Sequence, residues 1–197
     1  RATPGFRQLQ HELAYLYGGQ LLPTRLPIGS TDVIRTAPRQ RLLDFYNAYY
    51  RPENAVLVIV GDVDPVQIEA KISAQFGDWK GEGMAGPAPD QGHPARRSLD
   101  ATIYSDPAAT QRITLTWLRP ANMEPDSRSK RVRETVEAIG FAVLNRRLSR
   151  IASSDNPPFV GASGGKGELA DTAESTQINA VAKPGQWRRA LRIIEQE

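Results

Sequence analysis

Residues 49–64, YYRPENAVLVIVGDVD, decide the fold predicted for this chain. The two tyrosines end a helical pattern, the following Arg-Pro-Glu-Asn forms a turn, and the apolar run at 54–61 shows no polar alternation. Such a run predicts a strand buried on both faces. Asp64 followed by Pro65 predicts the start of a helix, because aspartate caps helices and proline suits the first turn. The stretch therefore predicts a helix, a strand and a second helix in succession.

Further helical and extended patterns lie on both sides of this stretch. Apolar residues recur at helical spacing over residues 6–18, and Pro38 opens the helix that ends at the two tyrosines. A long helix is predicted over residues 128–153, capped by Asp126 or Ser127, and a last one over 186–197. Strands are predicted over residues 101–105, 111–118, 159–169 and 174–183. This order predicts an α+β fold, with helices packed on a mixed, largely antiparallel sheet.

The composition changes sharply in the middle of the chain. Residues 81–100 are dense in Gly and Pro and poor in large apolar side chains, which is typical of a linker. We therefore expect one domain segment over residues 1–80 and a second over residues 101–197. Because residue 1 is Arg and residue 197 lies inside a helical pattern, we expect the chain to be a piece of a longer protein.

Charge and composition argue against several classes of protein. The net charge of +3 comes from 25 basic and 22 acidic residues, a mixed surface that disfavours nucleic-acid binding. No apolar run is long enough to cross a bilayer. The chain has no Cys, which excludes disulfides and thiolate metal ligands and is compatible with either the cytoplasm or the periplasm.

Residues that could carry chemistry are few. His11 would need a second metal ligand four positions later, where Tyr15 stands, and His93 lies beside Pro94 in the linker. We therefore expect no self-contained zinc site. The glycines of residues 161–167 resemble a phosphate loop in composition but not in spacing, and they predict a strand that another backbone can approach closely.

Two further features have a simple structural interpretation. Asp62 is expected to turn the chain before the helix at residue 65 and not to act in catalysis. The basic residues of the long helix predict a solvated face with Glu134 and Glu137 interleaved, and binding of an acidic partner or substrate remains an alternative. These basic residues are Arg128, Lys130, Arg131, Arg133, Arg146, Arg147 and Arg150.

The stretch at 49–64 resembles the M16 zinc metallopeptidases, the relatives of pitrilysin, insulin-degrading enzyme and mitochondrial processing peptidase. The segments at 26–29, 42–54, 113–117, 144–148 and 156–159 extend the resemblance over nearly the whole chain. The family implies paired α+β domains around a chamber, in which zinc bound by a His-x-x-Glu-His motif and a later Glu cuts peptides. That motif is absent from this chain, and in the family order it precedes residue 1.

The resemblance also implies a place for one catalytic contact. Family members use an Arg and a Tyr, seven residues apart, to stabilise the transition state from a non-catalytic domain. Arg150 falls near the expected Arg, but residue 157 is Pro, and Phe159, the nearest aromatic residue, has no hydroxyl group. Arg150 is therefore the one candidate for such a contact in this chain.

The resemblance predicts the end of a catalytic domain over residues 1–80 and the front of an inactive domain over 101–197. Such a segment would form chamber wall and domain packing surface of a zinc metalloendopeptidase, with peptides or unfolded proteins as substrates and the remaining domains as partners. We expect no zinc and no cleavage in the segment alone, and we favour a periplasmic parent over a cytoplasmic one. The alternative is a non-catalytic peptide-binding or assembly subunit, which a degenerate upstream zinc motif would identify.

Overall fold

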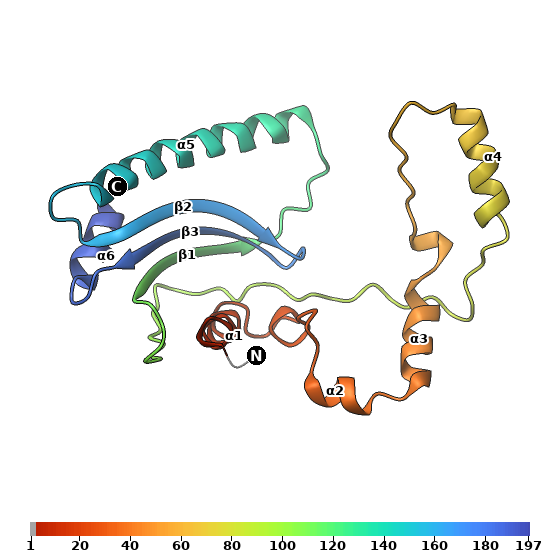
Figure 1. The fold of residues 1–197 in the computed structure, drawn as a ribbon, viewed down its shortest axis with the longest axis horizontal. Helices are drawn as coiled ribbons and strands as arrows, with labels where there is room; N and C mark the ends of the chain where they lie inside the picture. The colour runs from red at the N-terminus through yellow and green to blue at the C-terminus, as the bar shows by residue number, and fades with distance from the viewer. Residues whose placement is uncertain (1–2) are drawn as a thin grey trace. The chain divides into compact units, whose positions relative to one another are not determined.

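The computed structural model describes residues 3–197, and the chain divides into two compact units (Figure 1). The first unit combines Arg1–Leu26 with Gln91–Glu197, and the second is Pro27–Asp90. The units group residues by spatial contact, so the domain boundaries expected at 80 and 100 from the sequence stay predictions. Within residues 3–197, none of the helices combines the length and the apolar character that crossing a membrane requires.

The first unit contains a three-stranded antiparallel sheet in the order β1-β3-β2 (Figure 1). Helix α5 runs along β2, and α6 contacts β1 and β3. The predicted α+β class and the largely antiparallel sheet are thus confirmed, as are the three predicted helices and three of the predicted strands in this unit. The elements are α1 (Pro4–Leu16), β1 (Arg112–Pro120), α5 (Arg128–Ala152), β2 (Phe159–Leu169), β3 (Ala173–Ala182) and α6 (Trp187–Gln196).

Two apolar clusters hold this unit together. On one face of the sheet, α5 and α6 bury Leu148, Phe159 and Ile194, whose side chains are at most 2% exposed. Ile113 and Leu115 of β1 pack against this cluster, as residues of the same strand face must when side chains alternate. The second cluster lies at one end of the other face, where α1 packs on the sheet. Its buried members are Leu13, Tyr17, Leu22 and Ala173.

The segment that follows the linker packs along α1 through polar contacts. The Arg7 guanidinium donates two hydrogen bonds to Asp106 Oδ2, at 2.8 and 2.5 Å. His11 Nε2 lies 3.2 Å from Thr102 Oγ1, and its ring lies 5.0 Å from the Tyr104 ring. The strand predicted at 101–105 is therefore wrong. Its side chains bind a helix, and no neighbouring strand offers it a ladder of backbone hydrogen bonds.

Asp106 should make the stability of this contact depend on pH. The Ala108 N–H at 2.9 Å, followed by the Arg7 guanidinium, lowers the pKa of the Asp106 carboxyl. Because the pKa of Asp106 is lower in the folded state, its carboxylate stabilises the fold at pH values above the unfolded-state pKa of about 3.9. That contribution disappears as the pH falls through the folded-state pKa.

Replacement of Arg7 by alanine should raise the pKa of Asp106, but not to its unfolded value, because the Ala108 N–H still donates. Titration of the carboxyl carbon by NMR measures this shift. The matched control is Gln8→Ala on the same helix, which should leave the pKa unchanged. An unchanged pKa of Asp106 in the Arg7 variant would contradict the assignment.

The second unit consists of short helices joined by loops and contains no strand among its described residues. Its elements are the helices α2 (Thr31–Thr36), α3 (Arg39–Tyr49) and α4 (Pro65–Phe76) and a 3-10 helix at Pro52–Asn54. Another 3-10 helix, Leu22–Thr24, belongs to the first unit. The predicted cap of α4 is confirmed, because Asp64 Oδ1 accepts from the N–H groups of Val66 and Gln67. Helix α2 was not predicted, because six residues are too few to show a helical period.

The guanidinium of Arg51 connects the end of α3 to the segment around residue 82. Its Nη1 donates to the carbonyl oxygens of Asn47, Glu82 and Gly83, at 3.2, 2.9 and 3.1 Å. A Cβ added at Gly81 would lie 2.3 Å from the Arg51 Cζ, so a larger residue there would have to push the guanidinium aside. The first residues of the predicted linker are therefore bound to the end of α3.

The buried strand predicted at 54–61 is wrong. The backbone of this segment forms no ladder, and Val56, Val58 and Val60 are 90%, 75% and 93% exposed. An apolar run becomes a strand only beside a neighbour that shares its backbone hydrogen bonds. The described residues of the second unit contain no other strand that could serve as that neighbour.

Candidate functional site

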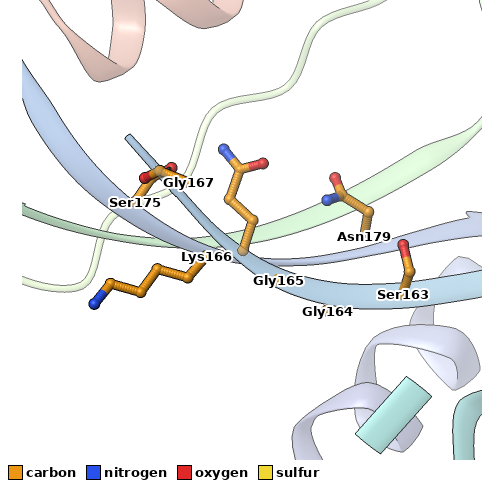
Figure 2. Close-up of a pocket in the computed structure, with 8 residues that line it drawn as sticks. Ser163, Gly164, Gly165, Lys166, Gly167, Ser175 and Asn179 are labelled. Atoms are coloured by element: carbon orange, nitrogen blue, oxygen red, sulfur yellow. Dashed lines mark hydrogen bonds between the residues drawn. The ribbon is translucent and has the colours of Figure 1, made fainter. Parts of the chain in front are cut away.

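A shallow hollow on the open face of the sheet is the first candidate site (Figure 2). It lies opposite the face that α5 covers and has a volume of about 290 Å³. The antiparallel register pairs Ser163 with Asn179, and the next pair on this face is Gly165 with Gln177. Thr114 of β1 continues the first row and donates to Asn179 Oδ1 at 2.8 Å. Hydroxyl and amide groups of Ser163, Gln177 and Asn179 therefore line the floor of the hollow, and Lys166 also lines it.

Glycines keep this hollow open. A Cβ added at Gly165 or Gly167 would meet no atom within 4 Å, and neither residue has a positive φ. Neither packing inside the chain nor backbone conformation requires glycine there. Glycine inside a strand is unfavourable by about 0.5–1 kcal/mol relative to alanine, and it often marks a place where another backbone approaches closely. The strand predicted at 161–167 is confirmed, because these residues lie in β2. The close approach of another backbone there stays a prediction.

A second hollow of about 300 Å³ lies on the α5 side of the same strand. Lys166 and Gly167 line both hollows, so the two meet at β2. Lys166 points away from the side on which Asn179 projects (Figure 2). Its Nζ lies 2.9 Å from both Glu137 of α5 and Glu174 of β3. Hydrogen bonds to Glu137 and then Glu174 raise the pKa of Lys166, which keeps this lysine charged.

The sheet order makes the outer side of β2 an edge. Strand β3 lies on one side of β2, and within residues 3–197 no strand lies on the other. An edge strand presents unpaired N–H and C=O groups on which an extended chain can form further backbone bonds. The side chains of such an added strand would alternate between the two faces and enter the two hollows in turn. The arrangement therefore suits an extended peptide.

The structure separates the residues that the family resemblance grouped. Arg150 lies on the exposed surface near the end of α5. Pro157 is buried, and the Phe159 side chain is completely buried in the apolar cluster, where it cannot reach a substrate. The role of Arg150 in a transition-state contact stays a prediction.

Three of the seven basic residues named on α5 form ion pairs with acidic side chains. Arg131 pairs with Asp126, Arg133 pairs with Glu124, and Arg147 Nε lies 2.6 Å from Glu197. These pairs are exposed, as expected of a solvated face, but their partners are Asp126, Glu124 and Glu197 and not the interleaved Glu134 and Glu137.

Residues 3–197 bring no three His, Asp or Glu side chains together in a group that could hold a metal ion. His11 contacts Thr102 and Tyr104, and neither is an acidic or histidine ligand. Residues 3–197 therefore do not supply a zinc site of the kind that the family resemblance implies.

The predicted turn at Asp62 agrees with the backbone, where the Val63 N–H donates to the Gly61 carbonyl at 3.1 Å.

Comparisons with known proteins agree with this architecture. A family model described as the peptidase M16 inactive domain matches residues 36–154. The probable zinc protease PqqL of Haemophilus influenzae is 38% identical over 68 residues, which are 34% of this chain and 7% of that protein. This chain thus spans a small part of the length of that relative.

Two solved structures share the fold. The first half of the periplasmic protease PqqL from Escherichia coli aligns with a TM-score of 0.69 and 18% identity, covering 93% of this chain and 39% of that one. A mutant of the ferredoxin protease FusC, in complex with Arabidopsis ferredoxin, aligns with a TM-score of 0.74 and 20% identity, covering 98% of this chain and 21% of that one.

Proposed function

Because the chain belongs to the peptidase M16 family, with its match to the inactive domain, we propose that it forms a non-catalytic part of a zinc metalloendopeptidase. In the complete protein, zinc and the residues that bind it would come from outside residues 3–197. The substrates would be peptides or unfolded proteins. The similarity to a periplasmic protease supports a periplasmic location for the parent.

We further propose that the edge of β2 holds an extended segment of the substrate. The observation that carries this proposal is the position of an edge strand between two hollows, one on each face of the sheet. Backbone groups of β2 would pair with the substrate backbone, and Ser163, Gln177 and Asn179 would contact every second side chain. Affinity would then come mostly from the main chain, which suits an enzyme that accepts many sequences.

A second role, packing against other domains, is supported by the outer surface of α5. Its exposed apolar residues recur at helical spacing and form a stripe that faces away from the sheet. Domain interfaces within a chain bury surfaces of this kind. The stripe consists of Val132, Val136, Ile139 and Val143, which are 55–64% exposed.

Peptide binding can be tested by anisotropy with a labelled, unstructured peptide of about ten residues, the upper end of the usual length of a strand. Gly165→Val should lower its affinity at least tenfold, because the new side chain fills the open hollow. Gly161→Val is the matched control: it lies in the same strand and in open space but does not line the hollow. Absence of saturable binding to the unmodified chain, or equal affinity in both variants, would contradict the proposal.

A further inference from the structure

The outer edge of β2 is closed at one residue by a side chain. The Gly164 N–H donates to Asn145 Oδ1 at 2.6 Å, and Asn145 Nδ2 donates to the Gly164 carbonyl at 3.0 Å. Asn145 lies on α5, so the two bonds run from a helix side chain to a strand backbone. A neighbouring antiparallel strand would bind Gly164 with the same paired donor and acceptor. The carboxamide of Asn145 therefore stands where one residue of an added strand would stand.

The alternation of hydrogen bonds along β2 shows which groups this closure affects. In an antiparallel pair, each residue directs both its backbone groups either toward its partner strand or away from it, in alternation. Because the backbone groups of Gly164 bind Asn145, those of Ala162 and Lys166 also point away from β3. In the part of the chain that the structure describes, no side chain binds these two neighbours in the same way. The edge is thus closed at its centre and open on both sides.

Glycine at position 164 lets α5 come close enough for this contact. A Cβ at this residue would lie 2.7 Å from Leu144 Cδ2 and 3.5 Å from Phe141 Cδ1. Gly164 therefore differs from Gly165 and Gly167, whose added Cβ atoms would meet open space. Two kinds of glycine alternate in this strand: one admits the helix, and the others leave the opposite face free.

We propose that Asn145 is a strand mimic that limits which peptides the edge of β2 accepts, an inference that rests on the proposed peptide binding. A short peptide can pair with Lys166 and Glu168 alone, without disturbing the carboxamide. A longer extended peptide, which pairs with Ala162 and Lys166 at once, must displace Asn145 from Gly164. Asn145 is thus a positioning residue that sets the length and register of the bound segment.

The first test is amide hydrogen exchange in the full chain, followed by NMR. In Asn145→Ala the Gly164 amide should exchange at least tenfold faster, whereas the Gly165 amide, which points toward β3, should keep its protection. Asn145→Asp keeps the side-chain size and an acceptor for the Gly164 N–H but sets a carboxylate oxygen against the Gly164 carbonyl, so the Gly164 amide should exchange more slowly than in Asn145→Ala. Ser149→Ala, one turn further along α5 and exposed, is the matched control. Unchanged protection of Gly164 in both Asn145 variants would overturn the proposal.

The second test measures the affinity of labelled peptides of four and ten residues. Two neutral hydrogen bonds contribute about 0.5–1.5 kcal/mol each, and a peptide that need not break them gains roughly 5- to 150-fold in affinity. Asn145→Ala should therefore bind the ten-residue peptide at least about fivefold more tightly and the four-residue peptide equally. If the unmodified chain and Asn145→Ala bind the long peptide with equal affinity, the role of Asn145 is overturned, but the proposed peptide binding is not. Absence of binding to either variant would instead contradict the proposed peptide binding, while the exchange of Gly164 would still decide whether Asn145 closes the edge.

Discussion

Replacement of Phe159 by alanine is expected to lower the free energy of unfolding of the first unit by about 3–5 kcal/mol. The side chain is completely buried and packs in the cluster that contains Leu148 and Ile194. Its removal takes apolar surface out of the core and leaves a cavity that α5 and α6 can close only in part. Phe159 also begins β2, so the loss should loosen the strand that we propose as the binding edge.

Urea unfolding, followed by tryptophan fluorescence, measures this loss. Val160→Ala is the matched control, because Val160 is the next residue of the same strand and is 69% exposed. We expect the control to change the free energy of unfolding by about 0.5 kcal/mol or less. A loss below about 1 kcal/mol for Phe159→Ala would show that the core described above does not hold the strand.

Replacement of Arg51 by alanine should release the segment around residues 81–86 from α3. The guanidinium binds three backbone carbonyl groups, and its side chain is 8% exposed. Loss of the charge-assisted bonds that this nearly buried guanidinium donates should lower the local stability of the second unit by about 1.5–3 kcal/mol. The ion pair with Glu53 adds little, because the Glu53 side chain is 61% exposed.

Limited proteolysis detects this release as faster cleavage between residues 80 and 90. Arg51→Lys separates geometry from charge: one ammonium group cannot reach all three carbonyl groups, so cleavage should still be faster than in the unmodified chain. Arg41→Ala, which replaces an exposed arginine of α3, should leave the cleavage rate unchanged. Equal rates in all of these proteins would refute the role of Arg51.

Local signals in the sequence were sufficient for most helices and for the positions of the three strands in the sheet. Asp64 and Ser127 cap α4 and α5 as predicted, because a capping residue acts on the next few residues only. The strand predicted at 54–61 failed for the opposite reason. Its apolar composition is a local property, whereas its pairing depends on a neighbour that the local pattern does not contain.

The candidate site was only partly predictable. The glycines at 161–167 indicated close approach of another backbone, but the sequence did not show which of them faces the helix and which faces the open hollow. That distinction depends on the register of β2 against β3 and on the packing of α5. The contact between Asn145 and Gly164 joins residues 19 positions apart through a single rotamer, and no spacing rule predicts it.

The discontinuous composition of the first unit has a consequence for synthesis on the ribosome. Gln20, just after α1, donates to the carbonyl of Thr172, which is 152 positions later in the chain. At 5–20 residues per second, α1 emerges about 8–30 s before the strand on which it rests. During that interval the apolar face around Leu13 and Tyr17 can pack only against nearby residues such as Leu22, and it lacks the cover that Ala173 of the sheet later provides. The nascent chain should therefore be a substrate for chaperones that bind exposed apolar helices, and slower translation after residue 26 should lengthen this vulnerable period.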